Sequence, residues 1–172
     1  MKWHERIVQL VLIKQRLAEV DRDKLWPHHL LAVAATEADI QAVERHLGEA
    51  IDPTYRAFLR KAAGWNSFFQ AVDLFGPSDL VVGSKWQLGQ DALASLEENV
   101  IGDMGFDRDE LLPIAASPTQ LDLFVMAKRE SSEPGAVIWI AGYEVDRYPT
   151  FADYFDAMVA YNEREVRALM NA

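Results

Sequence analysis

The hydrophobic pattern begins with an amphipathic helix that stands apart from the rest of the chain. Over residues 3–20 the apolar positions recur at helical spacing and share one face, which includes Trp3, Ile7, Val8, Val11 and Leu12. A polar cluster at 21–24 indicates a turn, and Pro27 opposes continuation of the helix. We interpret residues 1–29 as a helical extension and residues 30–172 as the main part of a single domain.

A pair of short helices gives the clearest pattern in the sequence. The first follows Thr36, a favourable N-cap residue with acidic residues in the next turn, and ends at Gly48. The second starts at Asp52, with Pro53 in the first helical position, and ends at Gly64. The tight connection predicts that the two helices pack together.

The second half of the chain predicts strands closed by one long helix. Residues 68–77 indicate one strand or strand-like edge before Gly76-Pro77, and Ser78 caps a short helical turn. A helix is expected over 91–101, and the closing helix opens at Thr150. Three short apolar runs predict buried strands at 111–117, 121–128 and 136–143. This order predicts an α+β fold with a mainly antiparallel sheet flanked by helices.

Composition is consistent with one globular domain that needs no disulfide bonds to stabilise its core. The chain has 172 residues, of which 50% are hydrophobic and 26% charged, and it contains no cysteine. Disulfides, thiolate nucleophiles and thiolate metal sites are therefore excluded. The N-terminus lacks the pattern of a secretory signal, and no apolar run reaches the length of a membrane span. We expect a cytoplasmic protein without a membrane partner.

The negative charge is concentrated rather than spread evenly. The net charge is −10; residues 1–35 carry +2, and residues 91–110 alone carry −6. Such a surface repels phosphate backbones, so nucleic acid is not expected as a partner. It would accelerate the approach of a basic protein. The alternative is that the acidity serves solubility alone.

Catalytic and metal-binding patterns are missing from the sequence. No G-x-S-x-G elbow or phosphate-binding glycine loop is present, and the four histidines favour structural, exposed roles. His28 and His29 are adjacent, which is poor geometry for two ligands of one metal. The acids from Asp103 to Glu110 lack the glycine and spacing of a calcium loop. We therefore expect no enzyme activity, no cofactor and no metal.

Two groups of residues are candidates for binding a protein partner. Trp65 and Phe68 follow the helix stop at Gly64, and Trp86 lies in an expected loop at 83–87, where aromatic side chains often anchor interfaces. Packing in the core is the competing interpretation for these aromatic residues. The acidic candidates, which would steer a basic partner, are Asp103, Asp107, Asp109 and Glu110.

The helix pair also resembles the opening signature of the SUKH superfamily. The matching residues, Thr36 to Trp65, read T-E-A-D-I-x-x-V-E-x-x-L-G-x-x-I-x-P-T-Y-R-x-F-L-R-x-x-x-G-W. Three later blocks occur in the family's order: L-L-P-I-A at 111–115, G-A-V-I-W at 135–139 and F-A-D-Y-F at 151–155. The resemblance covers roughly residues 30–160, so the first helix lies outside it.

This resemblance implies a curved antiparallel sheet flanked by helices, and a role in binding proteins. The superfamily includes the yeast Smi/Knr cell-wall regulators and many bacterial immunity proteins. Our leading hypothesis is an immunity protein that neutralises a cognate toxin in a stoichiometric complex, its acidic surface complementing a basic active-site region. A non-enzymatic scaffold in cellular or envelope regulation is the alternative, and an enzyme with an unrecognised site is the third.

Overall fold

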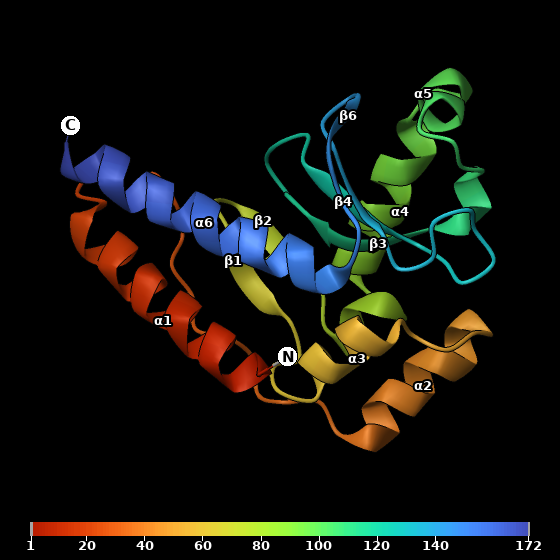
Figure 1. Ribbon diagram of the computed structural model, residues 1–172, viewed down its shortest axis with the longest axis horizontal. Helices are drawn as coiled ribbons and strands as arrows, with labels where there is room; N and C mark the ends of the chain where they lie inside the picture. Colours follow the sequence, from red (N-terminus) through yellow and green to blue (C-terminus); the bar gives the residue numbers. More distant parts are fainter. Residues whose placement is uncertain (1, 172) are drawn as a thin grey trace.

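Two long helices from opposite ends of the chain lie side by side in the computed structural model, which describes residues 2–171 (Figure 1). Helix α1 spans Trp3–Val20 and helix α6 spans Phe151–Met170. They run in the same direction, because Trp3 contacts Phe155 at one end and Arg16 reaches Met170 at the other. The helix predicted over 3–20 and the closing helix capped by Thr150 are both confirmed.

The sheet is an open meander of six strands that follow one another in sequence order. Every neighbouring pair is antiparallel, which confirms the predicted α+β class. The strands are β1 (Trp65–Phe69), β2 (Val72–Leu74), β3 (Leu111–Ala116), β4 (Leu123–Ala127), β5 (Val137–Ile140) and β6 (Glu144–Tyr148).

The region predicted as one strand at 68–77 is instead the β1–β2 hairpin. Ser67 and Gln70 both adopt positive φ, near 50°, so the bulge and turn are built without the glycine that usually signals them. The carboxylate of Asp73 stabilises the bulge by accepting the Ser67 N–H at 2.7 Å. Strand β6 was not predicted, because its sequence, EVDRY, is mostly polar and lies at the sheet edge.

The helix predicted over 91–101 is two helices, α4 (Ser84–Ser95) and α5 (Glu98–Asp103). Leu96 between them has an extended backbone, and the Arg108 side chain donates to the carbonyl of Leu96 at 2.7 Å. Short 3₁₀ turns, η1 (Pro77–Leu80) and η2 (Arg108–Glu110), flank the two helices in sequence. The expected loop at 83–87 is the first turn of α4, so Trp86 is a helical residue.

Helices cover both faces of the sheet. Phe124 of β4 packs against Tyr154 of α6, with ring centroids 5.0 Å apart. The next residue, Val125, points to the opposite face together with its partner Pro113 in β3, because side chains alternate along a strand. Pro113 packs under Gly89 of α4, where a Cβ atom would come within 2.8 Å of the proline. The sheet therefore lies between α6 and α4.

Helix α1 belongs to the same hydrophobic core as the sheet. Trp3 contacts the rings of Phe58, Phe151 and Phe155, with centroids between 5.3 and 5.7 Å away. Further along α1, Ile7, Leu10 and Leu17 are buried. The helix expected as an extension thus packs beside α6 (Figure 1) and contributes to the core.

Candidate partner-binding surface

Two of the three predicted aromatic anchors lie in the core. Trp65 is 2% exposed and its indole N–H donates to the carbonyl of His29 at 3.1 Å. Phe68 is fully buried against Tyr154 and Phe155. Both side chains belong to β1 rather than to a loop, and both are buried. Neither side chain is accessible to anchor a partner.

The third predicted anchor, Trp86, is half-buried on α4. Its ring meets the ring of His46 edge-on, with centroids 5.8 Å apart. His46 lies on α2, which spans Glu37–Leu47, and the following helix α3 spans Pro53–Leu59. Trp86 therefore joins α4 to the helix pair while part of the indole remains accessible.

The four predicted acids follow one another through α5 and η2. Asp103, Asp107 and Asp109 are exposed and Glu110 is partly buried. The Glu110 carboxylate accepts the backbone N–H of Asp107 at 2.7 Å, so it also stabilises the turn. In Figure 1, α5 lies at the end of the molecule opposite the α1–α6 pair.

Arginine side chains hold both ends of α5. Arg108 donates to the carbonyls of Leu93 and Leu96 before the helix and pairs with Glu98 at 2.7 Å in its first turn. Arg147 of β6 donates to the carbonyl of Met104 at 2.7 Å, directly after the helix. We call residues 98–110, which comprise α5 and η2, the acidic segment. These contacts anchor the acidic segment to α4 and to the sheet, and Asp103, Asp107 and Asp109 face solvent.

Trp86 and Asp109 line the same hollow, although they are distant in sequence. This hollow has a volume of about 420 Å³, and it shares Leu47, Leu112 and Lys128 with a second hollow of about 380 Å³. We call the two together the Trp86 groove. Its walls come from α2, the α2–α3 connection, α4, η2 and the β4–β5 loop. Its charged lining residues are Glu49, Asp52, Arg108, Asp109, Lys128 and Arg129.

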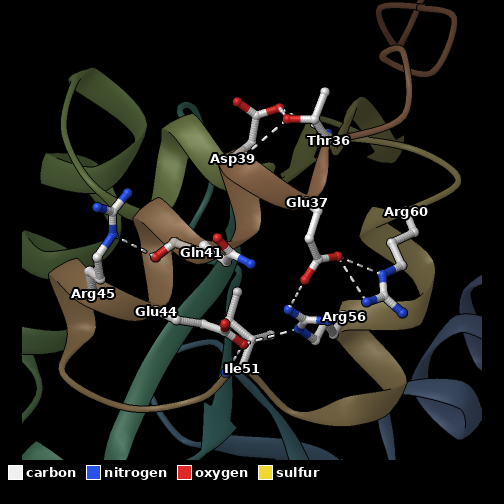
Figure 2. A network of polar contacts seen from close by, with 9 residues as sticks. All are labelled: Thr36, Glu37, Asp39, Gln41, Glu44, Arg45, Ile51, Arg56 and Arg60. Atoms are coloured by element: carbon white, nitrogen blue, oxygen red, sulfur yellow. Dashed lines mark hydrogen bonds and ion pairs between the residues drawn. The ribbon is translucent and has the colours of Figure 1, made fainter.

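An ion-pair network between α2 and α3 fixes one wall of this groove (Figure 2). Glu37 binds both Arg56 and Arg60, the latter at 2.8 Å. These hydrogen bonds, first from Arg60 and then from Arg56, lower the pKa of Glu37 below its usual value. Glu44 accepts from Arg56 at 3.1 Å and from the backbone N–H of Ile51, a groove residue, at 3.2 Å.

Helix caps complete this wall. The predicted cap at Thr36 is confirmed, and it forms a capping box with Asp39. Asp52 caps α3 by accepting the N–H groups of Thr54 and Tyr55, at 2.9 and 3.0 Å.

A comparison with protein families gives a match to the SMI1/KNR4 family (SUKH-1) over residues 34–157, more than half of the chain. The chain belongs to this family.

The SUKH-1 span contains the whole Trp86 groove, the acidic segment and all six strands, and it excludes α1. No curated protein matches the chain. Sequence reasoning placed Trp86 and Asp109 in the binding set but missed the groove residues Leu47 and Lys128. Neither residue belongs to a motif, and only the fold brings them beside Trp86.

In this SUKH-1 chain, the side chains whose pKa values burial shifts strongly do not line the Trp86 groove. Burial lowers the pKa of Lys14 on α1 to about 8, and its ammonium group donates to the carbonyl of Ser67 at 2.7 Å. Burial raises the pKa of Glu165 on α6. Within residues 2–171 no three His, Asp or Glu side chains are arranged to hold a metal ion. No helix in that range is long and apolar enough to cross a membrane.

Proposed function

We propose that this SUKH-1 protein is a cytoplasmic immunity protein that binds and neutralises a cognate toxin in a stoichiometric complex. The observation that carries the proposal is the Trp86 groove, which adjoins the exposed acids of α5 and η2 within the family span. Concave surfaces with an aromatic side chain and a charged rim are typical of protein interfaces. Neutralisation by occlusion requires no catalytic group on this chain.

Electrostatics favour a basic toxin surface. Residues 91–110 carry a net charge of −6. Complementary charge steers diffusional encounter and raises association rates. A toxin that acts on an anionic substrate would present basic residues in its active site, and covering them would block the substrate.

Protection of cells tests the function. The chain should be co-expressed with a toxin gene that neighbours its own gene in the native strain, and cell survival measured. We expect survival with the chain and death without it. Cell death in the presence of well-folded, abundant chain would contradict the proposed function.

Association kinetics test the role of charge. The double variant Asp103→Lys/Asp109→Lys reverses two exposed acids and spares the Glu110–Asp107 hydrogen bond. We expect its association rate with that toxin at low salt to fall by at least about tenfold. The matched control, Glu5→Lys/Asp23→Lys, makes the same change in net charge on and after α1. Equal slowing by both variants would show that the location of the acids has no role.

The matched family is named after the Smi/Knr regulators, which favours a scaffold in cellular or envelope regulation as the second candidate function. A scaffold would be required in cells that contain no toxin. Deletion of the gene in a strain that also lacks the neighbouring toxin gene separates the two functions: a growth or envelope defect supports the scaffold, and normal growth supports immunity.

A further inference from the structure

Helix α4 has a second groove along its other side. Gly89 lets the helix sit directly on Pro113. Trp86 and Gln90 face the Trp86 groove. The opposite flank lines a hollow of about 540 Å³, which we call the Leu121 groove; its apolar residues include Leu88, Ala92, Leu96, Val100, Leu121 and Ile140.

The Leu121 groove differs from the Trp86 groove in the sign of its charges. Among the described residues that line the Leu121 groove, the only charged ones are Glu97 and Asp122. The Trp86 groove is lined by three cationic and three anionic side chains. From residue 91 to residue 103, the α4–α5 segment beside the Leu121 groove has four acidic residues and no Lys or Arg. A basic segment therefore fits the Leu121 groove better.

Leu121 is held out into solvent by an ordered loop. Leu121 is 79% exposed, although it lies within a loop whose backbone is closed by hydrogen bonds. The Ser117 N–H donates to the carbonyl of Asp122 at 2.9 Å, and the Ser117 hydroxyl oxygen accepts the Gln120 N–H at 3.0 Å. The Asp122 carboxylate accepts the Trp139 indole N–H at 2.7 Å. Leu121 is therefore presented at the groove at little entropic cost on binding.

A second exposed apolar side chain lies beside the same groove. Tyr143 is 68% exposed and directly follows Gly142, one of the residues that line the groove. Exposed aromatic and aliphatic side chains beside an apolar hollow are typical of interaction sites. The apolar residues and the acidic surroundings together specify one kind of occupant.

We infer that the Leu121 groove binds a segment of the partner protein in which apolar side chains are flanked by Lys or Arg. The apolar side chains fill the hollow against Leu88, Leu96 and Leu121, while the basic residues face Glu97 and the acids of α5. The inference rests on the proposed function for the partner's identity as a toxin, but the groove can be tested without the toxin.

The test is a titration of the full ¹⁵N-labelled chain followed by NMR. The probe is the capped hexapeptide Lys-Lys-Leu-Phe-Lys-Lys, and the comparison peptide is Glu-Glu-Leu-Phe-Glu-Glu. We expect saturable shift changes at Leu88, Ala92, Leu96 and Leu121 with the basic peptide, and none that saturate with the acidic one. Changes centred on the Trp86 groove, or equal binding of both peptides, would overturn the inference.

A matched pair of variants controls for nonspecific attraction. Leu121→Lys adds a cation at the groove, whereas Leu30→Lys makes the same change at a side chain that is 78% exposed and lies in the segment before α2. We expect Leu121→Lys to weaken peptide binding by about tenfold and Leu30→Lys to leave it within about twofold. Equal effects of the two variants would overturn the inference.

The experiments distinguish an error in the groove assignment from an error in the proposed immunity function. If the hexapeptide does not bind but the chain protects cells from the toxin, the groove assignment is wrong and the immunity function stands. If the hexapeptide binds at the groove but the chain does not protect, the basic-segment site stands and the immunity function is wrong.

Discussion

The two helical layers on either side of the sheet are built in contrasting ways. In the α1–α6 layer, polar side chains are tied to the core: Lys14 donates to the Ser67 carbonyl and Asn162 to the Phe68 carbonyl. In the α4–α5 layer, acids face solvent, and apolar grooves lie on both flanks of α4. We propose that the first layer mainly stabilises the fold and that the second layer binds the partner.

The two helix contacts also differ in the size of the residue at each. Trp3 fills the space between α1 and the core with a large ring that touches three other aromatic rings. Gly89 has no side chain, so α4 sits directly on Pro113. Hollows lie along both flanks of this helix.

The largest expected effect comes from opening the α1–α6 layer. Trp3→Ala removes a buried aromatic side chain, so we expect the free energy of unfolding to fall by about 3–5 kcal/mol in urea denaturation. Binding of the basic hexapeptide by the folded variant should match wild type at low temperature. A loss of stability below about 1 kcal/mol would contradict the structural role of α1.

The buried Lys14 should make stability depend on pH. Burial lowers its pKa in the folded protein to about 8 from 10.5, so the unfolded chain binds more protons between these values. Stability therefore rises with pH across the window from about 8 to 10.5, by about 3 kcal/mol from this group alone. Below pH 8 the cost of charging the buried amine is fully present.

The comparison variant for this effect is Lys14→Met, which keeps the apolar stem and removes the titration. Urea unfolding of both proteins at several pH values should give a steeper rise for wild type. Parallel curves would show that the Lys14 ammonium is solvated in the folded protein.

A smaller effect is expected where α4 meets the sheet. Gly89→Ala places a Cβ atom within 2.8 Å of Pro113, so the helix must shift outward. We expect a loss of about 1–3 kcal/mol in thermal or urea unfolding, accompanied by weaker hexapeptide binding at the Leu121 groove. Gly102→Ala on α5 is the control, because a Cβ atom there meets nothing within 4 Å. Similar losses in both variants would argue against the close α4 contact.

The smallest effect concerns the α2–α3 ion pairs. Arg56→Gln breaks the contacts with Glu37 and Glu44, and we expect only a small loss of stability because solvent screens these charges. Arg45→Gln on α2 is a matched control, since within residues 2–171 the Arg45 side chain bonds only to the carbonyl of Gln41 in its own helix. High salt should reduce the difference in stability between the two variants. If salt leaves that difference unchanged, packing rather than charge stabilises the contact between α2 and α3.

Features determined by local sequence could be predicted, and those determined by long-range packing could not. Thr36 and Asp52 cap helices through neighbours three residues away or fewer, so both starts were visible in the sequence. The β1–β2 turn uses Gln70 at positive φ without a glycine, and this hid the hairpin.

The binding surface shows the same limit. The acids of α5 and η2 were found because composition alone reveals them. The burial of Trp65 and the placing of Trp86 and Lys128 around one hollow could not be predicted, because both depend on segments far apart in the chain. Leu121 was predicted to belong to a buried strand at 121–128, and this was wrong, because β4 begins at Leu123 and Leu121 is 79% exposed.

The most direct test of the account is hydrogen–deuterium exchange of the chain, alone and with the toxin encoded beside its gene. We predict slower exchange in the complex over residues 84–110 and 117–122, with unchanged exchange along α1. Slower exchange along α1 and α6, with no change in α4 and α5, would contradict it.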